Sequence, residues 1–385
     1  MTQQNQYALN EEYDAKMTRK YEGKIKDGNL EIDDWFRADP EVTSLRFVEK
    51  FDIQTLKIYI NSDMNVKLRS STLKKLNLFN CMQVELYMQV DDLELENLEV
   101  LILQENNLEN DQLYNIAKFK KLHILDVSRN KVDLTHIHSV TSLTTLTMQE
   151  CGLKNIDQIT SLVNLEELDL SGNINIDISP LYKIKRVTKL SMNNCGLKDS
   201  DQIGQLINLK ELDIGGNDNL DITPLKNLVG LVKLNLSYCA LTQLSALKSL
   251  INLQTLDLSY NPNIIITELQ YLQKLTFLNL RDCNLVSVYV LRPLINLEVL
   301  HISYNNIIHL DANLDEMKNL EKLRVQYNFV SDFSQLEQHP NYNNLDEYGW
   351  RCFDISKQKN PSQKEQYSLL GVLVAGMVQS NFPQQ

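Results

Sequence analysis

The chain has 385 residues, a formal net charge of −12 at pH 7 and an isoelectric point near 5.1. This excess of acidic side chains opposes binding to the phosphates of nucleic acids and to anionic membranes, so neither is an expected partner. The length alone suggests two or three ordinary domains. The repeats described below replace that expectation, because a repeat array has one continuous core and no fixed size.

The N-terminal part of the chain precedes the repeats and divides into two segments. Residues 1–20 are polar and predict either disorder or a short helix. Residues 21–52 predict a hairpin-like cap on the first repeat, because the Asp27-Gly28-Asn29 turn separates two alternating runs. The first residues contain no apolar stretch of the kind found in signal peptides, which favours a cytoplasmic location.

A pattern, L-x-x-L-x-L-x-x-N/C, recurs through residues 53–330 in about thirteen units. From Cys151 to Asn305 each step is 22 residues, and the last position, here called the slot, alternates strictly between Cys and Asn. The true period there is 44 residues, which indicates duplication of a two-unit cassette. Units at both ends are irregular, as expected of the terminal repeats of a stacked array. The central slot residues are Asn173, Cys195, Asn217, Cys239, Asn261, Cys283 and Asn305.

Alternating apolar positions in each unit predict a short, half-buried strand followed by a corner. Leu168 and Leu170 are expected to point inward, and Asp169 between them outward. An Asn in the slot can satisfy several of the backbone groups that the corner buries, and can link one coil to the next. A Cys fits the same volume but satisfies fewer groups, so we expect the loop after each Cys to supply the missing partners from its own backbone.

The slot cysteines are interpreted as core packing, with a metal or redox role as the alternative. At a strand spacing of about 4.8 Å, cysteines two coils apart are about 10 Å apart, which is too far for a disulfide. Buried free thiols in this number favour a reducing compartment. His136 and His138 offer two ligands on one predicted strand face, but no third ligand accompanies them. We therefore expect no metal and no cofactor.

These motifs resemble the leucine-rich repeat family. The resemblance rests on LEELDLSGN (165–173), LKELDIGGN (209–217) and LQTLDLSYN (253–261), and it covers most of the chain. The repeat length is similar to that of the short subclass that includes the protein-phosphatase-1 regulator and the bacterial internalins. The resemblance implies an α/β solenoid. We expect a right-handed horseshoe with a parallel sheet on its concave face and short helical, 3-10 or irregular segments on its convex face.

Two columns of outward-facing side chains on the predicted concave face are candidate partner sites. The position between the second and third leucines carries Asp on alternate units and predicts an acidic stripe for a basic partner; the alternative is a solvated strand face. The position before the slot carries tyrosines toward the C-terminal half. They predict partner contact, with edge-to-edge packing that stiffens the sheet rim as the alternative. The candidate residues are Tyr238, Tyr260, Asp282, Tyr304, Tyr327, Asp169, Asp213, Asp257 and His301.

The segment after the repeats is divided into a cap and a tail. The aromatic residues within 331–360 predict a C-terminal cap. Residues 361–385 include an apolar run at 367–379, which is shorter than the roughly 20 residues that a membrane-spanning helix needs. This tail is interpreted as a helix docked on the array or on a partner, with a disordered tail or a membrane contact as alternatives.

The sequence contains none of the phosphate-loop, dinucleotide-binding, nucleophile-elbow or zinc-protease motifs that would indicate an enzyme. We therefore expect a non-enzymatic scaffold or adaptor that binds a protein partner on the concave face and is a monomer. The resemblance implies two alternatives. One is a regulatory subunit of a phosphatase or similar enzyme, and the other is a secreted or surface adhesin of internalin type.

Overall fold

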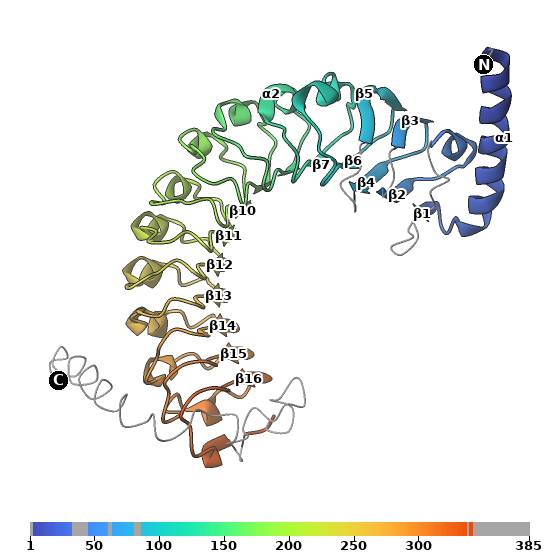
Figure 1. Cartoon of the computed structure of the whole chain (residues 1–385). Helices are drawn as coiled ribbons and strands as arrows, with labels where there is room; N and C mark the ends of the chain where they lie inside the picture. Colours follow the sequence, from blue (N-terminus) through green and yellow to red (C-terminus); the bar gives the residue numbers. More distant parts are fainter. Residues whose placement is uncertain (1–2, 33–44, 61–63, 81–85, 337–338, 342–385) are drawn as a thin grey trace. The chain divides into compact units, whose positions relative to one another are not determined.

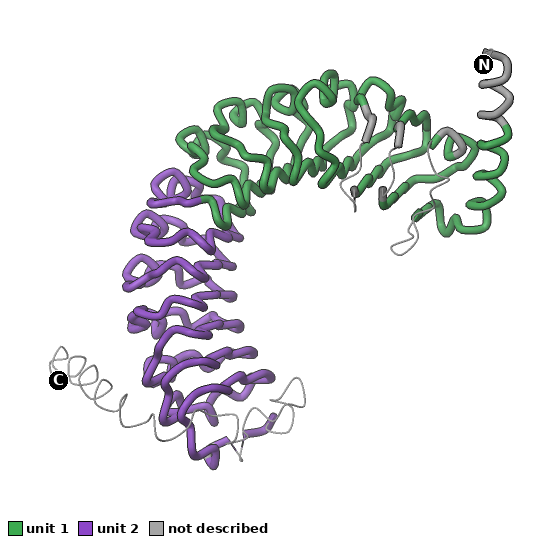
Figure 2. Tube along the Cα trace, in the orientation of Figure 1, with its two compact units in different colours: residues 1–195 green, residues 196–385 purple. Residues whose placement is uncertain are grey.

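A computed structural model describes residues 3–32, 45–60, 64–80, 86–336 and 339–341. The chain divides into two compact units, Met1–Cys195 (unit 1) and Gly196–Gln385 (unit 2), shown in different colours in Figure 2. The first two slot positions, Asn61 and Cys81, lie outside the described residues. So do the predicted tail (361–385) and most of the predicted C-terminal cap.

Unit 1 is built on a parallel sheet to which each repeat contributes one strand (Figure 1). The strand order is β1-β2-β4-β6-β7-β8-β9-β10. Neighbouring strands pair in register at the second leucine of each repeat, so Leu146, Leu168 and Leu190 form one buried row. The strands are β1 (Asn29–Ile32), β2 (Thr55–Ile60), β4 (Lys75–Asn80), β6 (Val100–Ile102), β7 (Ile124–Asp126), β8 (Thr145–Thr147), β9 (Glu167–Asp169) and β10 (Lys189–Ser191).

The return segments of unit 1 change character along the chain. In the first two repeats they are strands, β3 (Met64–Ser70) and β5 (Leu86–Leu95), which form a separate two-stranded parallel sheet. The expected helical or irregular segments are replaced here because Val66 and Leu68 are buried on either side of exposed Lys67, which is the two-residue period of a strand. Later repeats use short helices: α2 (Leu134–Ile137), η3 (Asn110–Leu113), η4 (Ile116–Lys118), η5 (Asp157–Ser161) and η6 (Leu181–Lys183).

The segment before the repeats begins with a helix, α1 (Gln3–Tyr21), which buries Met17 and Tyr21. It continues into the 3-10 helix η1 (Glu22–Lys24), and a second one, η2 (Arg46–Lys50), precedes the first repeat. Because the run before the Asp27-Gly28 turn is η1, the predicted hairpin reduces to a single antiparallel bridge between Lys26 and Asn29. β1 joins the sheet in parallel with β2 instead.

Unit 2 repeats the same architecture more regularly. Its strands follow one another in sequence order and pair in parallel, with one 3-10 helix in each return segment (Figure 1). The strands are β11 (Glu211–Asp213), β12 (Lys233–Asn235), β13 (Thr255–Asp257), β14 (Phe277–Asn279), β15 (Val299–His301) and β16 (Lys322–Arg324). The 3-10 helices are η7 (Ile203–Gln205), η8 (Thr223–Asn227), η9 (Ser245–Ser249), η10 (Thr267–Tyr271), η11 (Tyr289–Leu291), η12 (Leu314–Glu316) and η13 (Ser334–Leu336).

The core of unit 2 consists of leucine rows that run from coil to coil. Leu256 on β13 pairs in register with Leu234 and Leu278, and Leu258 lies directly beyond the strand; all four are almost fully buried. The prediction of an α/β solenoid with a parallel sheet is therefore confirmed in each unit. None of the helices in the described ranges combines the length and the hydropathy that crossing a lipid bilayer requires.

Candidate partner-binding surface

The slot asparagines connect each coil to the preceding one. The Asn261 side-chain oxygen accepts the main-chain N–H groups of Cys239 (3.2 Å) and Leu241 (2.9 Å). Its amide nitrogen donates to the carbonyls of Leu236 (2.9 Å) and Leu258 (2.8 Å). Four buried backbone groups are satisfied by one side chain, which fixes the spacing of the strands. Asn173 and Asn305 make the equivalent four bonds in their own coils.

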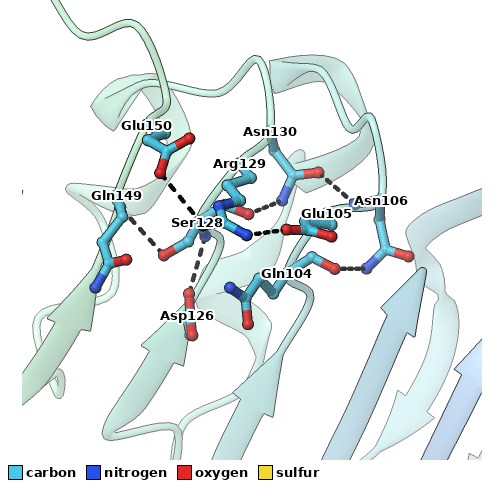
Figure 3. Close-up of polar contacts among 9 residues, drawn as sticks. All are labelled: Gln104, Glu105, Asn106, Asp126, Ser128, Arg129, Asn130, Gln149 and Glu150. Atoms are coloured by element: carbon cyan, nitrogen blue, oxygen red, sulfur yellow. Dashed lines mark hydrogen bonds and ion pairs between the residues drawn. The ribbon is translucent and has the colours of Figure 1, made fainter. Parts of the chain in front are cut away.

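Figure 3 shows the same connection in unit 1, next to a ladder of charged side chains. The oxygen of Asn130 accepts the main-chain N–H of Asn106 at 3.0 Å. On the residues just before the slot, the Arg129 guanidinium forms ion pairs with Glu105 and, at 3.3 Å, with Glu150. These two carboxylates raise the pKa of Arg129, mainly through the hydrogen bond that Arg129 donates to Glu105. The charges on this part of unit 1 are therefore paired within the chain.

The slot cysteines make only part of the asparagine contacts. The Cys239 thiol donates to the carbonyl of Ile214 at 3.4 Å, which replaces one amide donor. No thiol can replace the amide oxygen as an acceptor for the preceding coil. Instead the main-chain carbonyl of Cys239 accepts the N–H of Asn219 (3.0 Å), and that of Cys195 accepts the N–H of Asn175 (2.8 Å). The missing acceptor thus comes from the backbone, as expected, but from the cysteine itself rather than from the loop that follows it.

Burial keeps the slot thiols protonated. It raises the pKa of Cys151, Cys195 and Cys239 from 9.0 to about 11 and that of Cys283 to about 12. The unfolded chain loses these protons at lower pH than the folded chain, so folding stability should fall as the pH rises from about 9 to about 11. At pH 8 we expect the alkylation of these four cysteines, followed by peptide mass spectrometry, to require denaturant. Labelling of the native protein at the rate of a free thiol would contradict this placement.

The aspartates of the predicted acidic column lie at the ends of the strands, and their carboxylates accept hydrogen bonds from neighbouring groups of the chain. One oxygen of Asp257 accepts the main-chain N–H (2.9 Å) and the hydroxyl (2.6 Å) of Ser259. The other oxygen accepts from the Asn279 amide at 2.9 Å. An aspartate that binds the N–H two residues ahead stabilises a local turn. The same main-chain contact is made by Asp126, Asp169 and Asp213.

The tyrosine column stacks in two pairs on the strand face of unit 2, meaning the side chains of the strands and corners that point away from the core. The rings of Tyr238 and Tyr260 lie 4.0 Å apart with an interplanar angle of 12°. Those of Tyr304 and Tyr327 lie 4.3 Å apart at 26°. The rings are thus stacked face to face, not edge to edge. Tyr238 is 55% exposed and Tyr327 43%, so the packed rings remain accessible. Asp282 occupies the position between the two pairs and is exposed.

Every tyrosine of this column has a left-handed backbone. Their φ angles lie between 55° at Tyr238 and 60° at Tyr260 and Tyr327. The corner itself imposes this conformation, because Gly172 and Gly216 occupy the same position in earlier repeats with φ of 75° and 68°. A side chain in this region costs about 1–2 kcal/mol relative to glycine. Because glycine occurs at this repeat position in earlier units, the sequence already indicated that the backbone there is left-handed.

The structure also brings in a residue that sequence reasoning missed. The guanidinium carbon of Arg281 lies 4.2 Å from the ring centroid of Tyr304 and 5.6 Å from that of Tyr260. Arg281 therefore fills the gap that Asp282 leaves between the two stacked pairs. Its position in the repeat holds Ser237, Ser259 and Ser303 in the neighbouring coils, so the arginine was an outlier that could have been noticed. We call the continuous row the tyrosine–arginine ribbon: Tyr238, Tyr260, Arg281, Tyr304 and Tyr327.

The candidate histidines occupy different settings. His301 on β15 packs edge-on against Phe277, with ring centroids 5.5 Å apart, and pairs in register with Arg324. His136 and His138 belong to the helix α2 and its C-cap, so the predicted strand for this pair is wrong; Asp133 caps the helix and starts it there. Within the described ranges no three His, Cys, Asp or Glu side chains gather closely enough to hold a metal ion.

Comparison with known proteins agrees with this architecture. The family model described as leucine-rich repeats (2 copies) matches residues 141–183. An internalin of Listeria monocytogenes is 21% identical, with a TM-score of 0.62 over 75% of this chain and 85% of that one. A leucine-rich repeat protein of Leptospira interrogans is 21% identical, with a TM-score of 0.54 over 80% of this chain and 92% of that one.

At this identity, the likeness to these two structures shows the fold. A comparison with curated proteins finds no match. The repeated leucine pattern, the parallel strands in register and the family model that matches residues 141–183 agree with one another. The chain contains leucine-rich repeats, and each of its units has the fold of leucine-rich repeat proteins.

Proposed function

We propose that this protein is a non-enzymatic scaffold or adaptor and that unit 2 binds a protein partner through the tyrosine–arginine ribbon. The observation that carries the proposal is the placement of exposed tyrosines on left-handed backbone, where glycine would be less strained. Strained positions that persist in a folded protein concentrate at functional sites. Tyr238, Tyr304 and Tyr327 are exposed and Tyr260 is half-buried. Together the four rings supply a large contact area with few rotatable bonds.

The setting of the ribbon supports this function. Each tyrosine directly precedes a slot residue, and the slot asparagines hold successive coils together through buried hydrogen bonds. The contact surface is therefore formed before the partner arrives, and little conformational entropy is lost on binding. Leucine-rich repeat proteins generally act as protein-interaction scaffolds, which agrees with a surface of this kind.

The aspartate column, which predicted a basic partner, has less support as a binding surface than the tyrosine–arginine ribbon. The carboxylates of Asp169 and Asp257 each accept hydrogen bonds through both oxygens, so their charge already has partners inside the chain. A basic partner for this column stays a prediction. For location, we propose a reducing, intracellular compartment. The support is that buried Cys195, Cys239 and Cys283 and half-buried Cys151 form no disulfide within the described ranges.

Two alternatives remain without a supporting contact of their own. The likeness to an internalin is a likeness of fold, so an adhesin stays a prediction. A regulatory subunit of a phosphatase also stays a prediction, because the leucine framework is common to the whole family.

The test compares two double variants of the full chain in a protein-capture experiment. Tyr260→Ala with Tyr304→Ala removes one ring from each stacked pair. Tyr271→Ala with Tyr289→Ala removes two rings from the 3-10 side of unit 2, where Tyr271 is 44% exposed and Tyr289 59%. Captured proteins are quantified by mass spectrometry from an extract of the source cells. We expect a set of proteins that the wild type and the second variant retain and the first variant loses.

Thermal unfolding serves as the control for this comparison. Both double variants should unfold within a few degrees of the wild type, because exposed rings contribute about 1 kcal/mol per stacked pair. Capture of the same proteins in the same amounts by both double variants would rule out the ribbon as the binding surface.

A further inference from the structure

Arg281 completes the ribbon and differs in its electrostatic setting from the arginine in Figure 3. Arg129 in unit 1 lies between two glutamates and is paired with both. Arg281 lies between two tyrosine rings, and no carboxylate of the described residues comes within 4.0 Å of its guanidinium nitrogens. Its positive charge is therefore left without an ion pair in the part of the chain that the structure describes.

The surroundings of Arg281 limit which part of the guanidinium can reach a partner, because its Nε atom is buried without a hydrogen-bond acceptor among the described residues. A planar guanidinium that stacks on aromatic rings has its faces covered, and its N–H donors lie in the plane at its edge. Those donors match the two oxygens of a carboxylate, which can accept two parallel hydrogen bonds. The neighbouring rings also restrict the rotamers of the side chain, so less entropy is lost when an acceptor binds.

Charge changes sign along the strand face of unit 2. The outward positions of β11 to β13 and their corners carry three acidic residues and one basic residue: Glu211, Asp213, Asp257 and Lys233. The outward positions of β14 to β16 and their corners carry three basic residues and one acidic residue: Arg281, Lys322, Arg324 and Asp282. Arg281 therefore lies in a locally positive part of a chain whose net charge is −12.

We propose that Arg281 binds a carboxylate side chain in an acidic segment of the partner, with Tyr260 and Tyr304 packing against that segment. This inference rests on the proposed function, since it assigns the chemistry of the partner at the same surface. Asp282 is the one acidic residue beside the guanidinium in sequence, and it opposes the same ligand. Its removal and the removal of Arg281 therefore act in opposite directions.

The test uses a random heptapeptide library displayed on phage and selected on the full-length wild type and on three variants. The wild type should enrich peptides with Asp or Glu relative to the input library. Arg281→Met should lose the acidic preference, and Tyr260→Ala with Tyr304→Ala should lose enrichment altogether. Circular dichroism melting of each variant checks that the fold persists. Asp282→Asn should keep the preference and increase the enrichment.

The affinity of each variant for a synthetic peptide from the wild-type selection is then measured by fluorescence anisotropy. Arg281→Met should weaken binding about tenfold or more, because a charge-assisted bidentate contact is lost. Arg281→Lys should restore little, since an ammonium cannot form the paired in-plane bonds. Asp282→Asn should strengthen binding a few-fold, and added NaCl should weaken wild-type binding more than Arg281→Met binding.

The outcomes separate this inference from the proposed function. Peptides that depend on the two tyrosines but show no acidic preference would overturn the role of Arg281 and leave the proposed function standing. No tyrosine-dependent peptide at all would overturn both. Much tighter binding when the acidic residue is replaced by phosphoserine would overturn the carboxylate as the source of the charge.

Discussion

Replacing Asn261 by alanine is expected to lower the free energy of unfolding by about 2–6 kcal/mol. The main-chain N–H groups of two residues in the preceding coil lose the side-chain oxygen that accepts from them, and each unpaired buried group costs about 1–3 kcal/mol. Those groups belong to Cys239 and Leu241. Asn261 itself is fully buried, so water cannot replace the side chain without opening the coil. Urea unfolding followed by circular dichroism measures the difference.

The matched control for this variant is Cys239→Ala in the adjacent slot. Cys239 is equally buried, but its thiol makes only weak hydrogen bonds, to the carbonyls of Ile214 and Ser237, and accepts nothing from the preceding coil. The loss should therefore be about 1 kcal/mol. Equal losses at the two slots would mean that volume alone matters and that the hydrogen bonds between coils contribute little.

The second large effect is expected for Leu258→Ala. Leu258 is 0% exposed, and its truncation should cost about 2–5 kcal/mol from lost burial and the cavity left behind. Since each coil contacts only its neighbours, the loss should act locally. Hydrogen exchange measured by mass spectrometry should show reduced protection in β12 to β14 before the rest of unit 2 changes.

Ile251→Ala provides the control for the loss of aliphatic volume. Ile251 lies in the turn before β13 and is 54% exposed, so its truncation should change stability by less than about 0.5 kcal/mol. If Leu258→Ala caused uniform loss of protection throughout unit 2, coupling would extend beyond neighbouring coils, and the nearest-neighbour description would be wrong.

The regular part of the fold was predictable because its determinants are local. Each 22-residue unit contains its own apolar alternation and its own slot, so Leu256 and Leu258 could be assigned to the core without knowing their neighbours. The ends were less predictable. β1 precedes the repeats, and β3 and β5 lie in return segments, so the repeat pattern does not cover these strands. Alternation within one strand does not say which partner it selects, and the parallel pairing of β1 with β2 and of β3 with β5 could not be deduced.

The sequence was enough to predict which tyrosines share one face, but not how their side chains are arranged on it. The sequence column placed Tyr260 and Tyr304 on one face, while the stacking of their rings and the position of Arg281 between them depend on side-chain conformations. The role of the aspartate column was missed for a different reason. An aspartate whose carboxylate accepts the main-chain N–H two residues ahead, as Asp257 does from Ser259, is a local turn pattern. The sequence interpretation considered only the charge of these aspartates and did not consider this turn.

The most direct test of binding through the tyrosine–arginine ribbon is site-specific photocrosslinking in an extract of the source cells. A benzophenone side chain replaces Tyr304 in one protein and Tyr289 in another, so the reactive group lies on the strand face or on the 3-10 helix η11 of the same unit. Binding at the ribbon predicts a discrete crosslinked partner at position 304 and none at position 289. The same partner crosslinked only at position 289 would place the interaction on the opposite side of unit 2 and contradict it.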